Sequence, residues 1–317
     1  MIVIGAEEVA RRLDRRACIG LMRDAMIALS QGRTRQLLRG IIDLGSGDAF
    51  GVMPGAMEGA GFGAKLVSVF PSAAARGRSH QGAILLFDRE TGAPVCVIDA
   101  GEVTAIRTAC ASAAATDALA RADARRLAIL GTGEQAWQHA LAIRHVRTLD
   151  RIVLWGRSPE KAHALAARIA EATALPVDIA SSPAEAARDA DILCTTTAAS
   201  EPILHSAEVA DGTHINLVGS SRAGPVEIDG ALVRRARFFP DHREGVLAQG
   251  AEYLKAREAG LVDEAHVQPE IGAVFAGTAP GRRHPAEVTI YKSLGSIVQD
   301  LASAAYLHRR SRLDSGG

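Results

Sequence analysis

The segment that most constrains the fold is a glycine-rich turn, Gly131-Thr132-Gly133-Glu134-Gln135-Ala136. It follows the apolar run 127–130 and opens a stretch with helical spacing, and a second apolar run comes at 151–155. In such a turn the first glycine permits a tight bend, the second lets the backbone approach a pyrophosphate, and Ala136 keeps the helix close to the strand. The amino terminus of that helix faces the phosphates. Because strand, turn, helix and strand follow in this order, we interpret the segment as a dinucleotide-binding site rather than an ordinary turn.

The chain after residue 122 alternates short apolar runs with helical segments. This alternation is typical of a parallel, doubly wound sheet with helices on both faces. The predicted strands are residues 127–130, 152–155, 177–180, 192–195, 214–218 and 237–239. We therefore predict an α/β fold with a Rossmann dinucleotide-binding domain over residues 115–295.

The residues before this domain have a different pattern. Apolar residues recur at helical spacing over 7–30, and short apolar runs separated by Gly, Pro and Asp then predict an antiparallel sheet up to residue 98. Its clearest hairpin turns at residues 88–92. Alanine-rich residues 102–122 predict a helix that leads into the Rossmann domain, and residues 296–308 predict a helix that returns to the first domain. We assign the first domain to residues 1–114 plus 296–317, with disorder expected from residue 311.

Composition excludes several classes of partner. Lys plus Arg total 36 and Asp plus Glu total 36, so no basic field attracts nucleic acid, and aromatic residues make up only 4%. The four cysteines lie far apart, with no spacing suited to a metal, and are expected to be reduced core thiols. No apolar run resembles a signal peptide or a membrane span, so we expect a cytoplasmic protein without nucleic-acid, membrane or metal partners.

The end of the second predicted strand bears on which cofactor is bound. Sites that prefer NAD usually place a carboxylate there for the ribose hydroxyls, but this chain has Arg157 and Ser158, with Lys161 close behind. These side chains could hold a 2′-phosphate. We predict a preference for NADP(H), with NAD(H) still possible; the alternative is that Arg157 is only a solvated surface charge.

Several segments together resemble the ornithine cyclodeaminase/μ-crystallin family over nearly the whole chain. They are residues 51–54, 64–67, 79–81, 106–109, 129–136, 201–204, 214–219 and 292–295. The resemblance implies a Rossmann domain inserted into a mixed α/β domain that binds substrate and pairs its sheets across a homodimer. It also implies an α-imino or α-amino acid as the small-molecule substrate.

The resemblance further implies roles for individual residues. Arg39 and Arg107 would hold the substrate carboxylate, because a guanidinium pairs with a carboxylate through two parallel hydrogen bonds. Arg35 lies near Arg39 in the sequence and is the alternative to it. Lys65 would lie beside the reacting carbon–nitrogen bond, either donating a proton or supplying charge, and His80 would contact substrate or brace Lys65. Met53 and Ser221 complete the predicted substrate site. The predicted cofactor contacts are Thr108, Gly131, Thr132, Gly133, Glu134, Gln135, Arg157, Ser158, Lys161, Thr195, Thr197, Val218, Gly219, Ser293 and Gly295.

One departure from the family pattern bears on the reaction. Cyclodeaminases of this family place an aspartate where this chain has Ser221. We therefore predict an NADP(H)-dependent reductase of cyclic α-imino acids, such as pyrroline- or piperideine-2-carboxylate, or a reversible α-amino acid dehydrogenase. A cyclodeaminase-type lyase with bound NAD, an alanine-dehydrogenase-like enzyme and a non-catalytic NADPH-dependent ligand-binding protein remain as alternatives.

Overall fold

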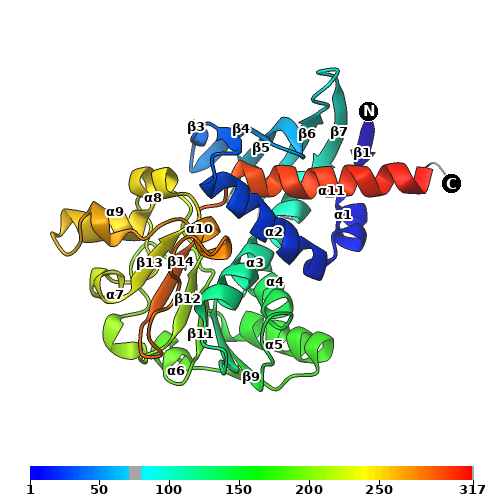
Figure 1. Ribbon diagram of the computed structural model, residues 1–317. Helices are drawn as coiled ribbons and strands as arrows, with labels where there is room; N and C mark the ends of the chain where they lie inside the picture. The colour runs from blue at the N-terminus through cyan, green and yellow to red at the C-terminus, as the bar shows by residue number, and fades with distance from the viewer. Residues whose placement is uncertain (71–79, 316–317) are drawn as a thin grey trace. The chain divides into compact units, whose positions relative to one another are not determined.

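The computed structural model describes residues 1–70 and 80–315. The chain forms two units, Met1–Arg107 with Ser296–Gly317 (unit 1) and Thr108–Gly295 (unit 2), and each contains its own sheet (Figure 1). The helix α3, Ala100–Leu119, runs across the division between the units, and the domain limit expected at residue 114 lies within it.

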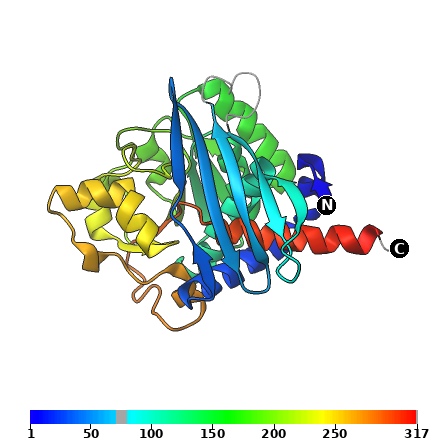
Figure 2. The same cartoon turned by 90° about the horizontal axis from the view of Figure 1, so that it is seen from above.

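Unit 1 is built on a sheet of seven strands in the order β1-β7-β6-β5-β4-β2, with β3 also paired to β4. Figure 2 shows its strands side by side in blue to cyan. Their bounds are β1 Ile2–Ile4, β2 Thr34–Gln36, β3 Gly40–Gly45, β4 Asp48–Met57, β5 Gly61–Val69, β6 His80–Phe87 and β7 Pro94–Asp99. The expected antiparallel pairing and the hairpin between β6 and β7 are confirmed, but β1 pairs parallel to β7.

The helices of unit 1 correct two sequence predictions. The single helix expected over 7–30 is two helices, α1 Ala6–Arg12 and α2 Arg15–Ser30. The break comes at Asp14, whose side chain accepts a hydrogen bond from the Ala17 amide at 2.9 Å and so starts a new helix. The final helix, α11 Ile297–Ser315, contradicts the disorder expected over residues 311–315, and it packs on β4, β5, β6 and α2.

Unit 2 has the predicted parallel sheet, in the strand order β10-β9-β8-β11-β12-β14-β13. Its strands are β8 Arg126–Leu130, β9 Arg151–Trp155, β10 Val177–Ile179, β11 Ile192–Thr195, β12 His214–Leu217, β13 Arg237–Pro240 and β14 Thr289–Lys292. The sequence analysis missed β14, which inserts between β12 and β13. Its four residues include Lys292, which is fully buried although a lysine is not expected in a buried strand.

Helices cover both faces of this sheet. They are α4 Glu134–Ile143, α5 Pro159–Thr173, α6 Pro183–Ala187, α7 Gly230–Arg235, α8 Arg243–Gln249, α9 Ala251–Glu258 and α10 Ile271–Phe275, with short 3₁₀ turns η2 Ser206–Glu208 and η3 Glu264–His266. Ala128 and Leu130 of β8 share one core cluster with α6, α7 and α9. Because strand side chains alternate, Leu127 and Ile129 are buried on the opposite face.

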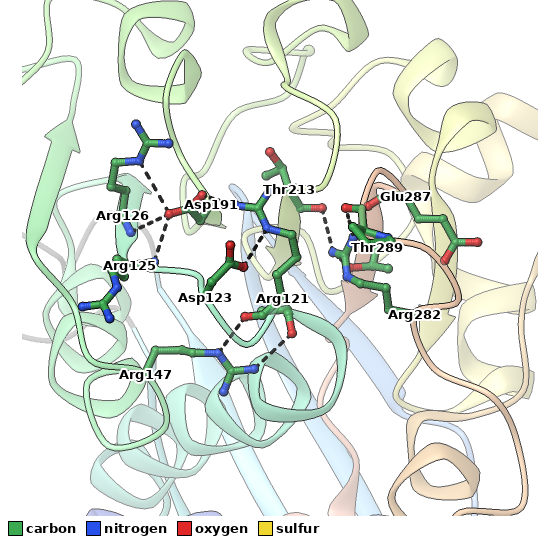
Figure 3. A network of polar contacts seen from close by, with 12 residues as sticks. Arg121, Asp123, Arg125, Arg126, Arg147, Asp191, Thr213, Arg282, Glu287 and Thr289 are labelled. Atoms are coloured by element: carbon green, nitrogen blue, oxygen red, sulfur yellow. Dashed lines mark hydrogen bonds and ion pairs between the residues drawn. The ribbon is translucent and has the colours of Figure 1, made fainter.

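A charged network joins the amino-terminal ends of the strands of unit 2 (Figure 3). Asp191 accepts hydrogen bonds from the Arg125 and Arg126 amides, each at 2.9 Å, and from Arg121 at 2.6 Å. Burial raises the pKa of Asp191, but these hydrogen bonds outweigh it and hold the pKa below its usual range. These contacts tie together the segments that precede β8 and β11, and the site described below lies at the opposite end of the sheet.

Two further sequence predictions concern the cysteines and membrane-spanning helices. Cys18, Cys96, Cys110 and Cys194 are all buried and unpaired with one another, as expected of core thiols. Within the described residues, the helices are too short or too polar to cross a bilayer.

Candidate active site and cofactor site

Lys65 is a buried cation on a strand of unit 1. Alternation along β5 turns Lys65 inward, with 4% of its surface exposed, and turns its neighbour Leu66 outward. In the sheet register Lys65 lies opposite Met53 of β4 and Ile84 of β6. The Lys65 Nζ donates to Thr104 Oγ1 at 2.6 Å and lies 3.4 Å from Asp300 Oδ1. Lys65 and Met53 are therefore adjacent, as their predicted roles require.

Arg107 comes to the same carboxylate from α3. Its Nε donates to Asp300 Oδ1 at 3.0 Å and its Nη1 to Gln299 Oε1 at 2.7 Å, and the side chain is buried. One aspartate oxygen therefore lies between the lysine and the arginine. Sequence reasoning missed Asp300 and Gln299; they are two adjacent polar residues within the otherwise apolar start of the last helix, and that pattern does not identify Arg107 as their partner.

The surroundings of Lys65 lower its pKa to about 8. Burial is the largest cause, because it disfavours the charged form, and the positive charges of Arg107 and Arg39 act in the same direction. Asp300 opposes them and raises the pKa. A lysine with a pKa close to neutrality exchanges its proton more readily than a solvated one, which suits general acid catalysis.

The structure also distinguishes the two arginines expected near the substrate carboxylate. Arg39 is half-buried and close enough to Lys65 to affect its pKa. Arg35 is exposed, and its guanidinium donates to the backbone carbonyls of Gly32 and Thr34 at 2.9 Å each. The backbone of His80 pairs with Val69, but its side chain lies outside the described residues, so its predicted role is not tested.

The glycine-rich turn of unit 2 has the shape that a pyrophosphate requires. Gly131 has φ of +132°, and a Cβ there would come within 2.5 Å of Thr196 Oγ1, so only glycine fits. At Gly133 a Cβ would meet nothing within 4 Å, which leaves open space beside the backbone. Gly133 caps α4 without a side-chain hydrogen bond, so the first N–H groups of that helix remain for a ligand.

Two side chains predicted to contact cofactor carry buried polar atoms that lack a protein partner. Gln135 Oε1 and Ser293 Oγ have no hydrogen-bond partner within residues 1–70 and 80–315. Buried polar atoms are usually hydrogen-bonded, so such atoms indicate a place for a ligand or water. Together with the open turn, they fit a bound dinucleotide.

The residues expected to read the adenosine ribose follow β9. Arg157 and Lys161 are exposed. Ser158 is the N-cap of α5, where its Oγ accepts a hydrogen bond from the Lys161 amide at 3.3 Å. Ser158 therefore has a structural role already, and its hydroxyl proton is still able to donate to a phosphate.

Glu227 lies behind the loops that follow β11 and β12. Its carboxylate accepts from Thr195 Oγ1 at 2.6 Å, from the Thr197 amide and hydroxyl at 2.7 Å each, and from the Gly219 amide at 2.8 Å. A Cβ on Gly219 would collide with this carboxylate and with the Thr197 carbonyl. The hydroxyls of Thr195 and Thr197, both predicted cofactor contacts, are thus directed at Glu227.

A second buried acid holds the loop after β14. Asp241 accepts from the amides of Leu294 and Gly295 at 2.8 and 2.7 Å. Lys292 forms an ion pair with Glu252 at 2.7 Å and donates to the Ser220 carbonyl at 2.7 Å. These contacts fix the loop that carries Ser221 and the backbone near the predicted cofactor contacts Ser293 and Gly295.

The remaining predicted residues also belong to unit 2. Thr108 is buried on α3, and the amide of Val218 donates to the Thr195 carbonyl at 3.0 Å. Glu134 accepts from Gln138 at 2.8 Å, and Thr132 packs where a Cβ on Gly156 would stand. The structure therefore gathers Lys65, Met53, Arg107 and Arg39 in unit 1, and the predicted cofactor contacts and Ser221 in unit 2.

The chain combines a Rossmann sheet that has an open phosphate turn with a second unit that contains a buried lysine–arginine pair. This combination is typical of enzymes that use a nicotinamide cofactor. The particular family follows from comparison: residues 2–315 match the ornithine cyclodeaminase/mu-crystallin family, and the chain belongs to it. The resemblance noted from the sequence is confirmed.

Relatives within the family include enzymes of imine reduction. A Delta(1)-pyrroline-2-carboxylate reductase of Bacillus cereus is 33% identical over 98% of this chain and 97% of its own length. The ketimine reductase mu-crystallin of Mus musculus is 36% identical over 73% of this chain and 69% of its own. The structure of Thermococcus litoralis Delta(1)-pyrroline-2-carboxylate reductase in complex with NADH and L-proline has a TM-score of 0.96 and 29% identity, and covers 100% of this chain and 98% of that one.

Proposed function

We propose that the protein is a nicotinamide-dependent reductase of cyclic α-imino acids, of the kind exemplified by pyrroline-2-carboxylate. The observation that carries this proposal is the buried Lys65 and Arg107 pair on Asp300, which offers a carboxylate-binding cation beside a proton donor. The reductases among its relatives support the substrate class. This function is favoured over the three alternatives, which are a cyclodeaminase, an alanine-dehydrogenase-like enzyme and a ligand-binding protein.

The chemistry assigns a task to each side chain. Reduction adds a hydride to the imine carbon and a proton to the nitrogen, so that C=N becomes CH–NH. Arg107, with Arg39, would bind the substrate carboxylate and fix the plane of the ring. Lys65 would place its proton at the imine nitrogen, and its pKa of about 8 suits that transfer near neutral pH. A bound nicotinamide cofactor supplies the hydride.

Ser221 argues against the cyclodeaminase reaction in this chain. A lyase acting on ornithine needs a negative charge for the distal ammonium, and a serine hydroxyl is a poor substitute for an ion pair in a closed site. Ser221 lies in a loop whose backbone is held by Lys292 and Glu227. The loop is therefore ordered, but it offers a neutral side chain at this position.

For the cofactor, we favour NADP(H) over NAD(H). Arg157 and Lys161 are exposed at the end of β9 and the start of α5, where a 2′-phosphate would approach. A guanidinium binds phosphate through charge-assisted hydrogen bonds. The relative described above was solved with NADH, so the preference proposed here rests on this chain's own Arg157 and Lys161.

We further propose a homodimer formed through the sheet of unit 1. Large apolar side chains are exposed on and beside β3, at Leu37 72%, Ile41 49%, Ile42 56% and Leu44 53%, and on β5 at Leu66 38%. Ile42, Leu44 and Leu66 lie on the same face of the sheet by register, and exposed apolar side chains gathered in this way are typical of an interface. A second copy of this chain would cover it, and light scattering of the purified protein measures whether it does.

The proposed activity is tested by following NADPH absorbance with synthetic cyclic imino acids of five- and six-membered rings. We expect steady NADPH consumption and accumulation of the matching cyclic amino acid. If NADPH binds but no imino acid is reduced and no amino acid is oxidised, the proposal is wrong and the ligand-binding alternative takes its place.

A further inference from the structure

Asp300 is a buried carboxylate whose two oxygens have different surroundings. Its side chain is fully buried in the first turn of α11. Oδ1 receives both the Arg107 Nε at 3.0 Å and the Lys65 Nζ at 3.4 Å. Oδ2 is buried as well, and it has no hydrogen-bond partner among residues 1–70 and 80–315. A carboxylate in this position carries a charge that its protein neighbours satisfy only in part.

Stability alone is a poor explanation for this arrangement. Removing an ion pair from water costs free energy that the pair often fails to recover, and an apolar residue of similar volume is commonly no worse. A buried oxygen without a partner adds to that cost. The observation therefore points to a task performed by the charge, at a place where two cations with proposed roles in catalysis meet it.

We propose that Asp300 is a positioning residue for imine reduction, holding the Lys65 ammonium and the Arg107 guanidinium in one fixed arrangement and keeping Lys65 protonated until its proton is needed. This inference rests on the proposed function. It goes further by assigning the balance of charge in the site to a residue more than half the chain away from Lys65 in sequence.

The groups around Lys65 show why Asp300 decides this balance. The neighbouring strands contribute Met53 from β4 and Ile84 from β6, neither of which carries charge. Helix α3 contributes the hydroxyl of Thr104 and the positive Arg107, and the segment before β3 contributes the positive Arg39. Burial and both arginines favour the neutral amine. Asp300 of α11 is the acid that opposes them.

The sign of the effect follows directly. A general acid is active while protonated, so the rate falls as pH rises through its pKa. Without the negative charge of Asp300, the pKa of Lys65 should fall below its value of about 8, and the alkaline limb of the kcat profile should move toward acid. Loss of an opposite charge within hydrogen-bond distance shifts a pKa by about 1 unit or more.

The experiment compares kcat against pH for the wild type, Asp300→Asn, Asp300→Glu and Gln299→Ala. We expect Asp300→Asn to move the alkaline limb by about one unit or more, and to approach wild-type kcat at the acid end. Asp300→Glu keeps the charge and should largely restore the limb. Gln299→Ala removes the neutral partner of Arg107, so it should raise KM and leave the limb in place. An unshifted limb in a folded Asp300→Asn variant overturns the proposal.

A second measurement does not depend on turnover. The chain has only four lysines, Lys65, Lys161, Lys255 and Lys292, so ¹³Cε-lysine labelling gives four NMR signals that single substitutions assign. The Lys65 signal should titrate near pH 8 in the wild type and at lower pH in Asp300→Asn. A wild-type Lys65 that is neutral well below pH 7 contradicts the proposal even if the variant does not fold. Absence of imine reduction with the expected titration would instead reject the proposed function, while the control of Lys65 protonation by Asp300 would stand.

Discussion

The two units each bury a carboxylate, and the two carboxylates have opposite surroundings. Glu227 of unit 2 accepts four hydrogen bonds, from the end of β11 and from the loops after β11 and β12, and uses both of its oxygens. Asp300 of unit 1 offers one oxygen to two cations, while its other oxygen has no partner in the described part of the chain. A carboxylate whose two oxygens both accept hydrogen bonds from backbone and hydroxyl donors stabilises the loops around it. A partly satisfied one between cations marks a place where charge is held for a substrate.

The largest expected effect is the loss of kcat on substitution of Lys65. Lys65→Met removes the proton donor, so kcat for the best imine should fall by about two to four decades, as is typical for loss of a general acid. NADPH binding should persist, because the lysine belongs to unit 1 and the phosphate turn to unit 2. Stopped-flow absorbance measures the first and fluorescence titration the second.

Lys255→Met is a matched control, since this lysine is exposed and lies 4.0 Å from Glu201. It should leave kcat unchanged. A Lys65→Met enzyme with near-normal kcat would contradict the assignment of Lys65 as the proton donor.

The next effect concerns stability and tests whether Glu227 stabilises the loops around it. In Glu227→Gln the amide can accept at one end only, so the donors at the other end lose their acceptor. Each buried donor left unsatisfied costs about 1–3 kcal/mol. We expect a clearly lowered free energy of unfolding and weaker NADPH binding, measured by urea denaturation and titration.

The exposed Glu258 on α9 provides the control, because Glu258→Gln removes a solvated charge and should change stability by less than about 0.5 kcal/mol. If Glu227→Gln is as stable as the wild type, the contrast between the two carboxylates is not real.

A smaller effect is expected on cofactor choice. A basic contact to the 2′-phosphate contributes about 1–3 kcal/mol, which corresponds to a preference for NADPH of about tenfold or more. Arg157→Ala should reduce the ratio of the NADH and NADPH dissociation constants toward one. Arg16→Ala, an exposed arginine on α2, should leave the ratio unchanged. Equal binding of both cofactors by the wild type would refute the preference.

The last effect concerns the pH dependence of folding. Burial lowers the pKa of His214 to about 3 and of His139 to about 4, from 6.5. The unfolded chain then binds more protons below pH 6.5, so stability should fall as pH decreases from there, by roughly 1.4 kcal/mol per pH unit for each histidine. Denaturant unfolding at pH 6.5 and at pH 4 measures this loss.

His139→Gln should make the slope shallower, while substitution of the exposed His163 should not alter it. A stability that does not change over this range would mean that the buried histidines do not resist protonation.

The sequence could predict features that depend on local pattern. The phosphate turn at Gly131 and the parallel strands around it follow from neighbours in the chain, whereas the role of Lys65 was predicted only from the family resemblance. Asp300 and Gln299 could not be found in this way, because they meet Arg107 across 193 and 192 residues of sequence. Strand β14 was missed because its four residues begin with Thr289 and end with Lys292, and the groups that make a buried lysine possible there, Glu252 and the Ser220 carbonyl, are distant in sequence.

The helix break near Asp14 is a different case. An aspartate three residues before Ala17 is a recognised N-cap signal, and the continuous apolar spacing on both sides concealed it. Such a local signal was available in the sequence, whereas the partner of a buried charge was not.

Substrate binding without turnover tests whether the Lys65–Arg107–Asp300 cluster receives the carboxylate of a cyclic imino acid. Pyrrole-2-carboxylate is a stable planar analogue, and calorimetry can measure its Kd with NADPH-loaded wild type and with Arg107→Leu. NADPH binding by the variant checks its fold. We expect at least about tenfold weaker binding by Arg107→Leu, because the variant lacks a charge-assisted hydrogen bond to the carboxylate. Equal Kd values for both proteins would contradict it.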